Sequence, residues 1–136
     1  MNSIVISVLL LACPCSNEVH FEGSSIAQDS VERGLKVLER GAGAYPSNQS
    51  CFSCHHQTLP MLAMMTARDA GVRFNRELFD QQSKFTRKSF DERKTRLAKG
   101  EHVGGRAATV SYGLWTLSLA KEAPDDLGAA MTSYLL

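Results

Sequence analysis

The sequence predicts an all-α protein, and two observations support this fold class. From Asp29 onward, apolar residues recur at spacings of three and four, the period of a helix with one buried face, and Gly, Pro and Asn separate these stretches. No segment shows the alternating β-branched residues that are typical of a strand. With 136 residues, of which 43% are hydrophobic and 21% charged, the chain can bury a core, which excludes collagen-like, low-complexity and wholly disordered classes.

Residues 1–15 have the pattern of an export signal. The apolar run from Ile4 to Ala12 has the length of the hydrophobic region of a signal peptide and is too short for a membrane span, which takes roughly 20 residues. Leu10-Leu11-Ala12-Cys13 resembles a bacterial lipoprotein processing site, at which Cys13 would carry a lipid anchor. We therefore expect a periplasmic or secreted protein. Because no Lys or Arg precedes the run, a short apolar strand or helix of a cytosolic protein stays open as the alternative.

A polar linker is predicted over residues 16–28, followed by a helical domain over residues 29–136. The first helix is predicted to begin with Asp29 or Ser30 as its N-cap and to end at Gly41 in a left-handed turn. Its predicted buried face consists of Val31, Leu35 and Leu38.

Two helices are predicted after the loop that follows. One begins with Thr58 as N-cap and Pro60 in its first turn, and it ends at Gly71. The next, longer helix begins with Asn75 as N-cap and ends at Gly100. Their expected core residues are Met61, Leu62, Met64, Met65, Leu78, Gln82, Phe85 and Ser89, with Phe79, Phe90 and Leu97 beside them.

Two more helices complete the prediction. One extends from about Arg106 to Lys121, and after a break at Pro124 the last begins with Asp125 or Asp126 as its cap. Their expected core residues are Ala107, Val110, Leu114 and Leu117 with Trp115 beside them, and Leu127, Ala130, Met131 and Tyr134.

The overall charge argues against nucleic acid as a partner. Fifteen Lys and Arg against 14 Asp and Glu give a net charge of +1, so no global field attracts polyanions. Between Arg73 and Arg106 the balance is ten basic against five acidic residues, but no aromatic platform interleaves with these charges. This stretch is either a solvated helix face or a surface for a phosphate or an acidic redox partner protein.

Cys51-Phe52-Ser53-Cys54-His55 is a C-x-x-C-H motif, the covalent attachment pattern of c-type haem. The two thiols must reach the two vinyl groups at one edge of the porphyrin, and a helical turn beginning at the motif would place both cysteines on one side. His55 would then lie under the iron as its proximal ligand. Haem is attached outside the cytoplasm, in agreement with the signal-like N-terminus. The sequence thus predicts haem c held by Cys51, Cys54 and His55.

The same residues suit other roles. Two cysteines at this spacing can form a redox dithiol or a structural disulfide, although the strand and helix of a thioredoxin-like site are not predicted here. Cys51, Cys54 and two histidines could also bind zinc, although His56 is too close to His55 to be a natural fourth ligand.

The sixth iron ligand is open. Met61, Met64 and Met65 follow the motif so closely that they are better explained as core residues. Met131 and His102 are far enough along the chain to approach from the opposite side and are the candidates. A His/Met pair would raise the reduction potential, whereas five-coordinate iron would suit ligand binding.

Three stretches carry a resemblance to a bacterial family: Gly34-Leu35-Lys36-Val37-Leu38-Glu39, Cys51 to Gln57 with Leu59-Pro60-Met61, and Gly100-Glu101-His102-Val103-Gly104-Gly105. They resemble the opening of exported proteins, common in planctomycetes, that combine C-x-x-C-H with terpenoid-cyclase/prenyltransferase toroid repeats. The similarity covers about the last hundred residues. It implies helical hairpins that form an arc of an α/α toroid, and an incomplete one, since another repeat would be expected after Leu136.

Catalysis is not implied by this resemblance. The Gln/Trp-rich repeats and the acidic protonating motif of squalene and hopene cyclases are absent, and Pro124-Asp125-Asp126 is better explained as a helix cap. We therefore expect no catalytic residues. The alternative to a haem module is a non-catalytic toroid fragment that acts as a binding scaffold, with Cys51 and Cys54 in a disulfide or a zinc site.

Overall fold

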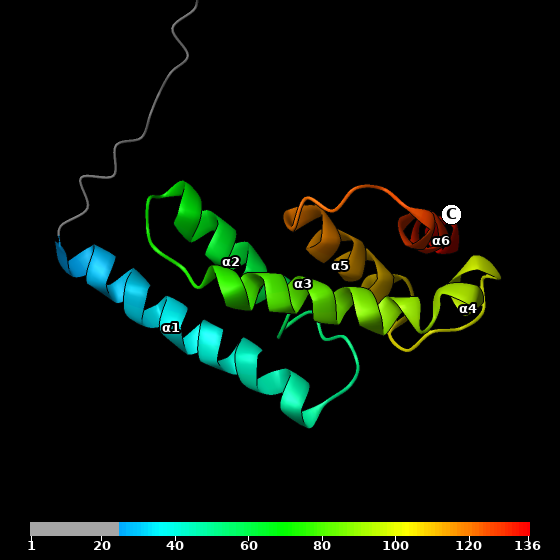
Figure 1. Ribbon diagram of the computed structural model, residues 1–136, viewed down its shortest axis with the longest axis horizontal. Helices are drawn as coiled ribbons and strands as arrows, with labels where there is room; N and C mark the ends of the chain where they lie inside the picture. Colours follow the sequence, from blue (N-terminus) through cyan, green and yellow to red (C-terminus); the bar gives the residue numbers. More distant parts are fainter. Residues whose placement is uncertain (1–24) are drawn as a thin grey trace, which may run out of the picture.

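The computed structural model describes residues 25–136, which form six helices (Figure 1). These are α1 (Ser25–Asn48), α2 (Thr58–Asp69), α3 (Arg76–Asp91), α4 (Lys94–Ala98), α5 (Arg106–Leu119) and α6 (Asp126–Leu135). This part of the chain contains no strand, so the predicted all-α class is confirmed. The predicted leader over residues 1–15, with Cys13, and the linker up to residue 24 lie outside the described residues. None of the six helices is both long and apolar enough to cross a bilayer.

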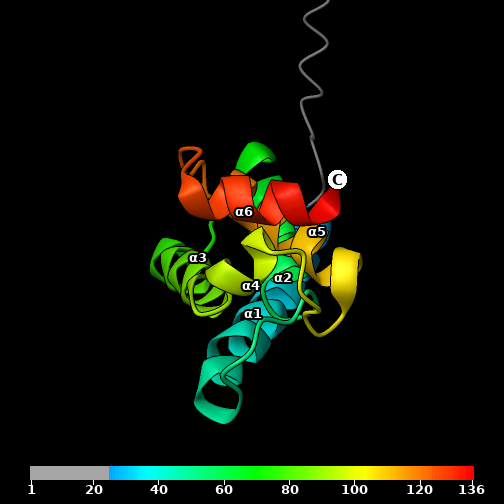
Figure 2. The ribbon, with the colours of Figure 1, turned by 90° about the vertical axis from the view of Figure 1, so that its right-hand side faces the viewer.

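The helices pack in overlapping groups around α3 and α5. α1 contacts α2 and α3, while α5 contacts α2, α3 and α6, and α4 contacts α6. Figure 1 shows α3 crossing in front of α5, with α1 along one edge and with α4 and α6 at the far end. Figure 2 looks onto that far end, where α6 lies beside α4 and α5. α3 and α5 therefore connect the N-terminal helices with α6.

Two apolar clusters form the core. The N-terminal cluster joins α1, α2 and the start of α3 and consists of Leu35, Ala42, Met61, Met64, Ala67, Leu78 and Phe79. The C-terminal cluster joins the end of α3 to α4, α5 and α6 and consists of Phe52, Phe90, Leu97, Val103, Val110, Leu117, Leu127, Ala130 and Met131. Along α3, the buried residues between the two clusters are polar, namely Gln82, Ser83, Thr86 and Ser89.

The predicted limits of the first helix are wrong at both ends. α1 begins at Ser25 instead of Asp29, and it continues through Gly41 to Asn48. Gly41 does not have the left-handed backbone of a helix stop. Packing explains the extension, because Ala42 is buried and Gly43 lies so close to α3 that an added Cβ would be 3.4 Å from Leu78 Cδ1.

The predicted third helix is also divided in two. α3 ends at Asp91, and α4 is a separate short helix. The break turns α4 onto α6, and its Leu97 is completely buried in the C-terminal cluster.

The predicted caps Asn75 and Asp125 are confirmed, since the side chain of each accepts a hydrogen bond from the backbone N–H three residues later. The predicted cap Thr58 is wrong, because Thr58 is the first residue of α2 and Gln57 precedes it as the cap.

Not every predicted core position is buried. Val31 and Leu38 are 47% and 43% exposed and line an open apolar groove of about 680 Å³ between α1 and α2. On α5, Ala107 is exposed and Trp115 is 42% exposed. These side chains lie on parts of α1 and α5 that the neighbouring helices leave uncovered.

Candidate functional site

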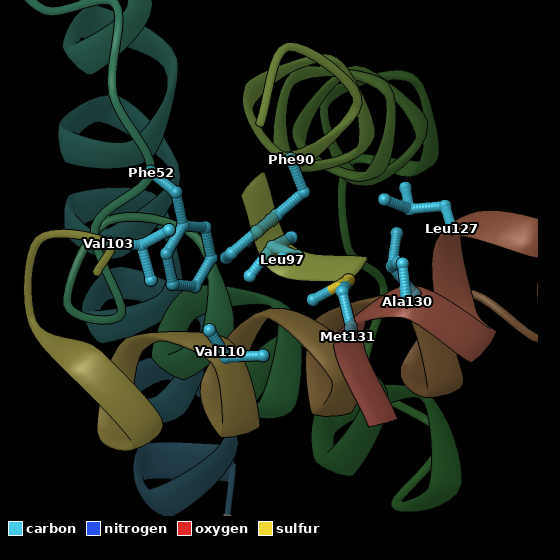
Figure 3. Packing of buried hydrophobic residues seen from close by; sticks show 9 residues of the cluster. Phe52, Phe90, Leu97, Val103, Val110, Leu127, Ala130 and Met131 are labelled. Carbon is cyan, nitrogen blue, oxygen red and sulfur yellow. The ribbon is translucent and has the colours of Figure 1, made fainter. Parts of the chain in front are cut away.

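The C-x-x-C-H residues lie in the connection between α1 and α2, and the first spacer residue anchors them. Phe52 is 7% exposed and belongs to the C-terminal cluster, with its ring centroid 5.2 Å from that of Phe90. Figure 3 shows the Phe52 ring beside Val103 and Phe90. The loop between the two cysteines is therefore fixed to the core by an aromatic side chain.

The second spacer, Ser53, is fixed through its backbone. Its N–H donates to Oε1 of Gln57 (2.7 Å), and its carbonyl oxygen accepts from the N–H groups of His56 (3.1 Å) and Gln57 (2.9 Å). The hydrogen-bonded turn thus begins at Ser53, not at Cys51 as predicted, and α2 follows only from Thr58. The peptide groups between the two thiols are held from the residues that follow the motif.

The two residues after the histidines connect the loop to α3 and α5. Gln57 and Gln82 are 0% and 1% exposed, and Nε2 of Gln57 donates to Oε1 of Gln82 (3.2 Å). Thr58 Oγ1 donates to the carbonyl oxygen of Tyr112 (3.1 Å) and lies 2.7 Å from Oγ1 of Thr116. Among the residues described, no buried side-chain nitrogen or oxygen lacks a partner. Each buried polar side-chain atom of this layer therefore has at least one partner.

α1 contributes Tyr45 to the site. Its ring stacks on His56, with centroids 4.3 Å apart and planes inclined by 21°, and it meets Phe85 of α3 edge-on at 6.2 Å. Its hydroxyl lies 3.6 Å from Sγ of Cys51. Nδ1 of His56 lies 3.2 Å from Oγ of Ser53. His56 is therefore packed against Tyr45 of α1 and bonded to Ser53 of the loop.

The environment of Tyr45 favours its neutral form. Burial raises the pKa of the Tyr45 phenol above its ordinary value of 10.0, and the hydrogen bond with Cys51 and the charge of that residue raise it further. A hydrogen bond with Ser53 partly offsets these effects on the pKa. The group beside the Cys51 sulfur is thus a neutral hydroxyl at ordinary pH.

The three residues predicted to bind haem remain accessible. Cys51 and His55 are exposed, Cys54 is half-buried, and both cysteines are free thiols. Sγ of Cys54 lies 3.4 Å from Nδ1 of His55. The structure therefore gathers two thiols and an imidazole on one short, anchored loop.

The candidate sixth ligands lie in different surroundings. Met131 is completely buried in the C-terminal cluster, against which Cys54 also packs, while His102 is exposed in the loop between α4 and α5. Within residues 25–136, no three or more His, Cys, Asp or Glu side chains lie close enough together to hold a metal ion.

Sequence reasoning missed Tyr45 and Gln57 as parts of this site and placed Gln82 in the core without a role. A signal was present, because Gln82 is a large polar residue within the predicted buried stripe of its helix and Gln57 follows the histidines directly. The stacking of Tyr45 had no signal, since the predicted end of its helix at Gly41 placed it in a loop.

No known protein family matches this chain, and no characterised protein or solved structure is detectably similar to it. The assignment of a function thus depends on the residues of this chain.

Proposed function

We propose that this protein binds haem c covalently through Cys51 and Cys54, with His55 as the proximal ligand of the iron. One observation supports this most. Two free thiols and an exposed imidazole occur in the order that c-type attachment requires, on a loop whose spacers are anchored. The anchoring keeps the reactive groups at the surface while Phe52 is buried.

The residues fit such a group. Haem would supply a redox-active iron and two vinyl groups. Cys51 and Cys54 would hold it, each by adding its sulfur to the vinyl carbon next to the ring and its proton to the terminal carbon, so no oxidant would be needed. Leu59, four residues after His55, is 43% exposed and offers apolar surface close to the motif. Its N–H donates to the carbonyl oxygen of Cys54 at 3.0 Å, which keeps it next to the turn.

The wider proposal concerns location and partner. The apolar run over Ile4–Ala12 supports export to the periplasm or secretion, with Cys13 as the site of a lipid anchor. The basic balance between Arg73 and Arg106 supports an acidic redox partner protein. An arc of an α/α toroid is part of the same proposal, and the all-helical fold of residues 25–136 is compatible with it.

Export in a bacterial host that carries a haem c maturation system tests the main proposal. The purified chain is expected to gain the mass of one haem, to stain for haem after denaturing electrophoresis, and to show a sharp reduced Soret band. The double variant Cys51→Ser/Cys54→Ser is expected to lose all covalent haem, because both thioethers are removed.

The two adjacent histidines provide a matched control. His55→Ala is expected to lose nearly all attached haem, since the proximal ligand is gone. His56→Ala removes a ring that stacks on Tyr45 and is expected to keep most of the haem, at some cost in stability. Equal losses in both variants would contradict the role given to His55.

A second function is favoured by the apolar groove between α1 and α2, which suits a non-catalytic binding scaffold. In that case, the exported chain would carry no haem. Its mass would instead show the loss of two protons, as in a Cys51–Cys54 disulfide, or the addition of one zinc ion.

A further inference from the structure

We propose that Gln57, held by Gln82, is a positioning residue that sets the backbone between the two thiols and so presents Cys51 and Cys54 as a pair. This inference rests on the proposed function for its biological purpose. Its geometry, however, can be tested on the free thiols.

The first step of the argument is that Gln57 holds one residue twice. Its side-chain Oε1 accepts from the N–H of Ser53 at 2.7 Å, and its own N–H donates to the carbonyl oxygen of Ser53 at 2.9 Å. Ser53 lies directly before Cys54 and two residues after Cys51. Both peptide groups of Ser53 are thus fixed, and one of them is shared with Cys54.

The second step is that the Gln57 side chain is itself fixed. It is completely buried, and its Nε2 donates to Oε1 of Gln82, which is also buried and lies on α3. The resulting chain of hydrogen bonds leads from Gln82 in the core, through Gln57, to the Ser53 N–H. Rotation of the Gln57 amide would break both of its side-chain bonds at once.

The third step is that stability alone does not explain the pair. Two buried amides that bond to each other can be replaced by apolar side chains of the same shape at little cost, because no polar atom is then left without a partner. Gln57 differs from such a pair in one respect, since it also supplies the acceptor for the Ser53 N–H. The feature that an apolar pair could not reproduce is the hold on the loop.

The test uses three variants of the full chain. Gln57→Met removes the acceptor for Ser53 and leaves Gln82 without its partner. Gln82→Met leaves the bond from Ser53 to Gln57 in place. The double variant Gln57→Met/Gln82→Met removes the acceptor but leaves neither amide unpaired, so it is expected to be more stable than Gln57→Met. Thr116→Val, which removes the bond to Thr58, serves as a destabilised control outside this chain of hydrogen bonds.

The haem-free measurement is the affinity of the reduced chain for phenylarsine oxide, which bonds both thiol sulfurs to one arsenic and releases water. Gln57→Met and the double variant are expected to bind it about fivefold more weakly, the factor that corresponds to one lost hydrogen bond. Gln82→Met is expected to weaken binding less than Gln57→Met does, because the bond from Ser53 stays but Gln57 loses the residue that holds its amide. Thr116→Val is expected to bind it like the unaltered chain.

A second measurement is the fraction of chains with two thioether bonds after maturation, which should fall in the same two variants. If affinity instead follows the measured stability of each variant, or if the double variant binds like the unaltered chain, the positioning role is overturned. If the unaltered chain takes up no haem, the proposed function fails, and the arsenical measurement still decides the role of Gln57.

Discussion

At the level of single residues, the two spacers of the C-x-x-C-H motif have opposite chemistry and a common effect. Phe52 is anchored in the C-terminal cluster by its side chain, whereas Ser53 is held by its backbone. The motif itself does not specify either residue. In this chain, the spacers anchor the loop, while Cys51 and His55 are exposed and Cys54 is half-buried against the C-terminal cluster.

Tyr45 is expected to make the free energy of unfolding depend on pH in the alkaline range. Because the phenol has a raised pKa in the folded chain, the folded state binds more protons than the unfolded state as pH rises above 10.0. The free energy of unfolding is therefore expected to fall with rising pH in that range. Denaturant unfolding of the unaltered chain and of Tyr45→Phe at several pH values measures the difference.

Phe at this position keeps the ring but cannot ionise, so the stability gap between the two proteins should shift in favour of Tyr45→Phe as pH rises. A gap that stays constant up to pH values well above 10.0 would show that the phenol titrates as it does in the unfolded chain.

At the level of helices, two glycines in similar helical positions have different surroundings. An added Cβ at Gly113 of α5 would collide with the Phe90 ring and lie 2.9 Å from Cε of Met131, whereas a Cβ at Gly41 of α1 would have no neighbour within 4 Å. Gly113→Ala is expected to destabilise the protein by about 1–3 kcal/mol through overpacking.

Gly41→Ala is the matched control, and it is expected to stabilise the protein by about 0.5–1 kcal/mol, because Ala loses less backbone freedom than Gly in a helix. The midpoints of urea unfolding measure both effects. Stabilisation by Gly113→Ala would mean that α5 and α3 lie further apart than described.

The sequence alone predicted the helices well where the signal is local. The stop at Gly71 and the caps Asn75 and Asp125 depend on nearby residues and agree with the structure. In the predicted stripe of α3, Leu78, Gln82 and Ser89 are buried and Phe85 is half-buried. The errors arise where distant packing decides. Gly41 is a helix stop by its residue type, but contacts of α1 with α2 and α3 carry the helix past it.

The same distinction holds for the candidate site. Cys51, Cys54 and His55 were evident as a motif, because their spacing in the sequence carries the chemistry. Gln57 and Tyr45 could not be found in this way. The role of Gln57 depends on its hydrogen bond with Gln82, which lies 25 residues away in the sequence. The role of Tyr45 depends on stacking with His56, which follows in the connection between α1 and α2.

At the level of the whole molecule, Arg87 joins α3 to the connection between α5 and α6. Its guanidinium bonds to Glu122 at 2.6 Å and also to Asp125. The Gly128 N–H and Arg87 together hold the pKa of Asp125 below its ordinary value of 3.8. The charged carboxylate therefore contributes stability that is present above pH 3.8 and is lost as pH falls through the lowered pKa.

Asp125→Asn is expected to keep the cap of α6, since Asn also accepts from the Gly128 N–H, but to lose the attraction to Arg87. At neutral pH this variant should be less stable than the unaltered chain, and below pH 3.8 the two stabilities should converge. Thermal unfolding across this pH range measures it, and parallel curves would contradict the assignment.

The one-sided packing of α1 has a consequence for the reactivity of Cys51. Helices with few neighbours are expected to undergo local unfolding more often than the rest of a fold. Hydrogen exchange of their backbone amides measures this local unfolding. Tyr45 belongs to the C-terminal part of α1. Each local opening of this end would therefore move the phenol away from the Cys51 sulfur and expose the face of the His56 ring. Fluctuations of α1 would in this way change how often the Tyr45 hydroxyl lies beside the sulfur of the exposed Cys51.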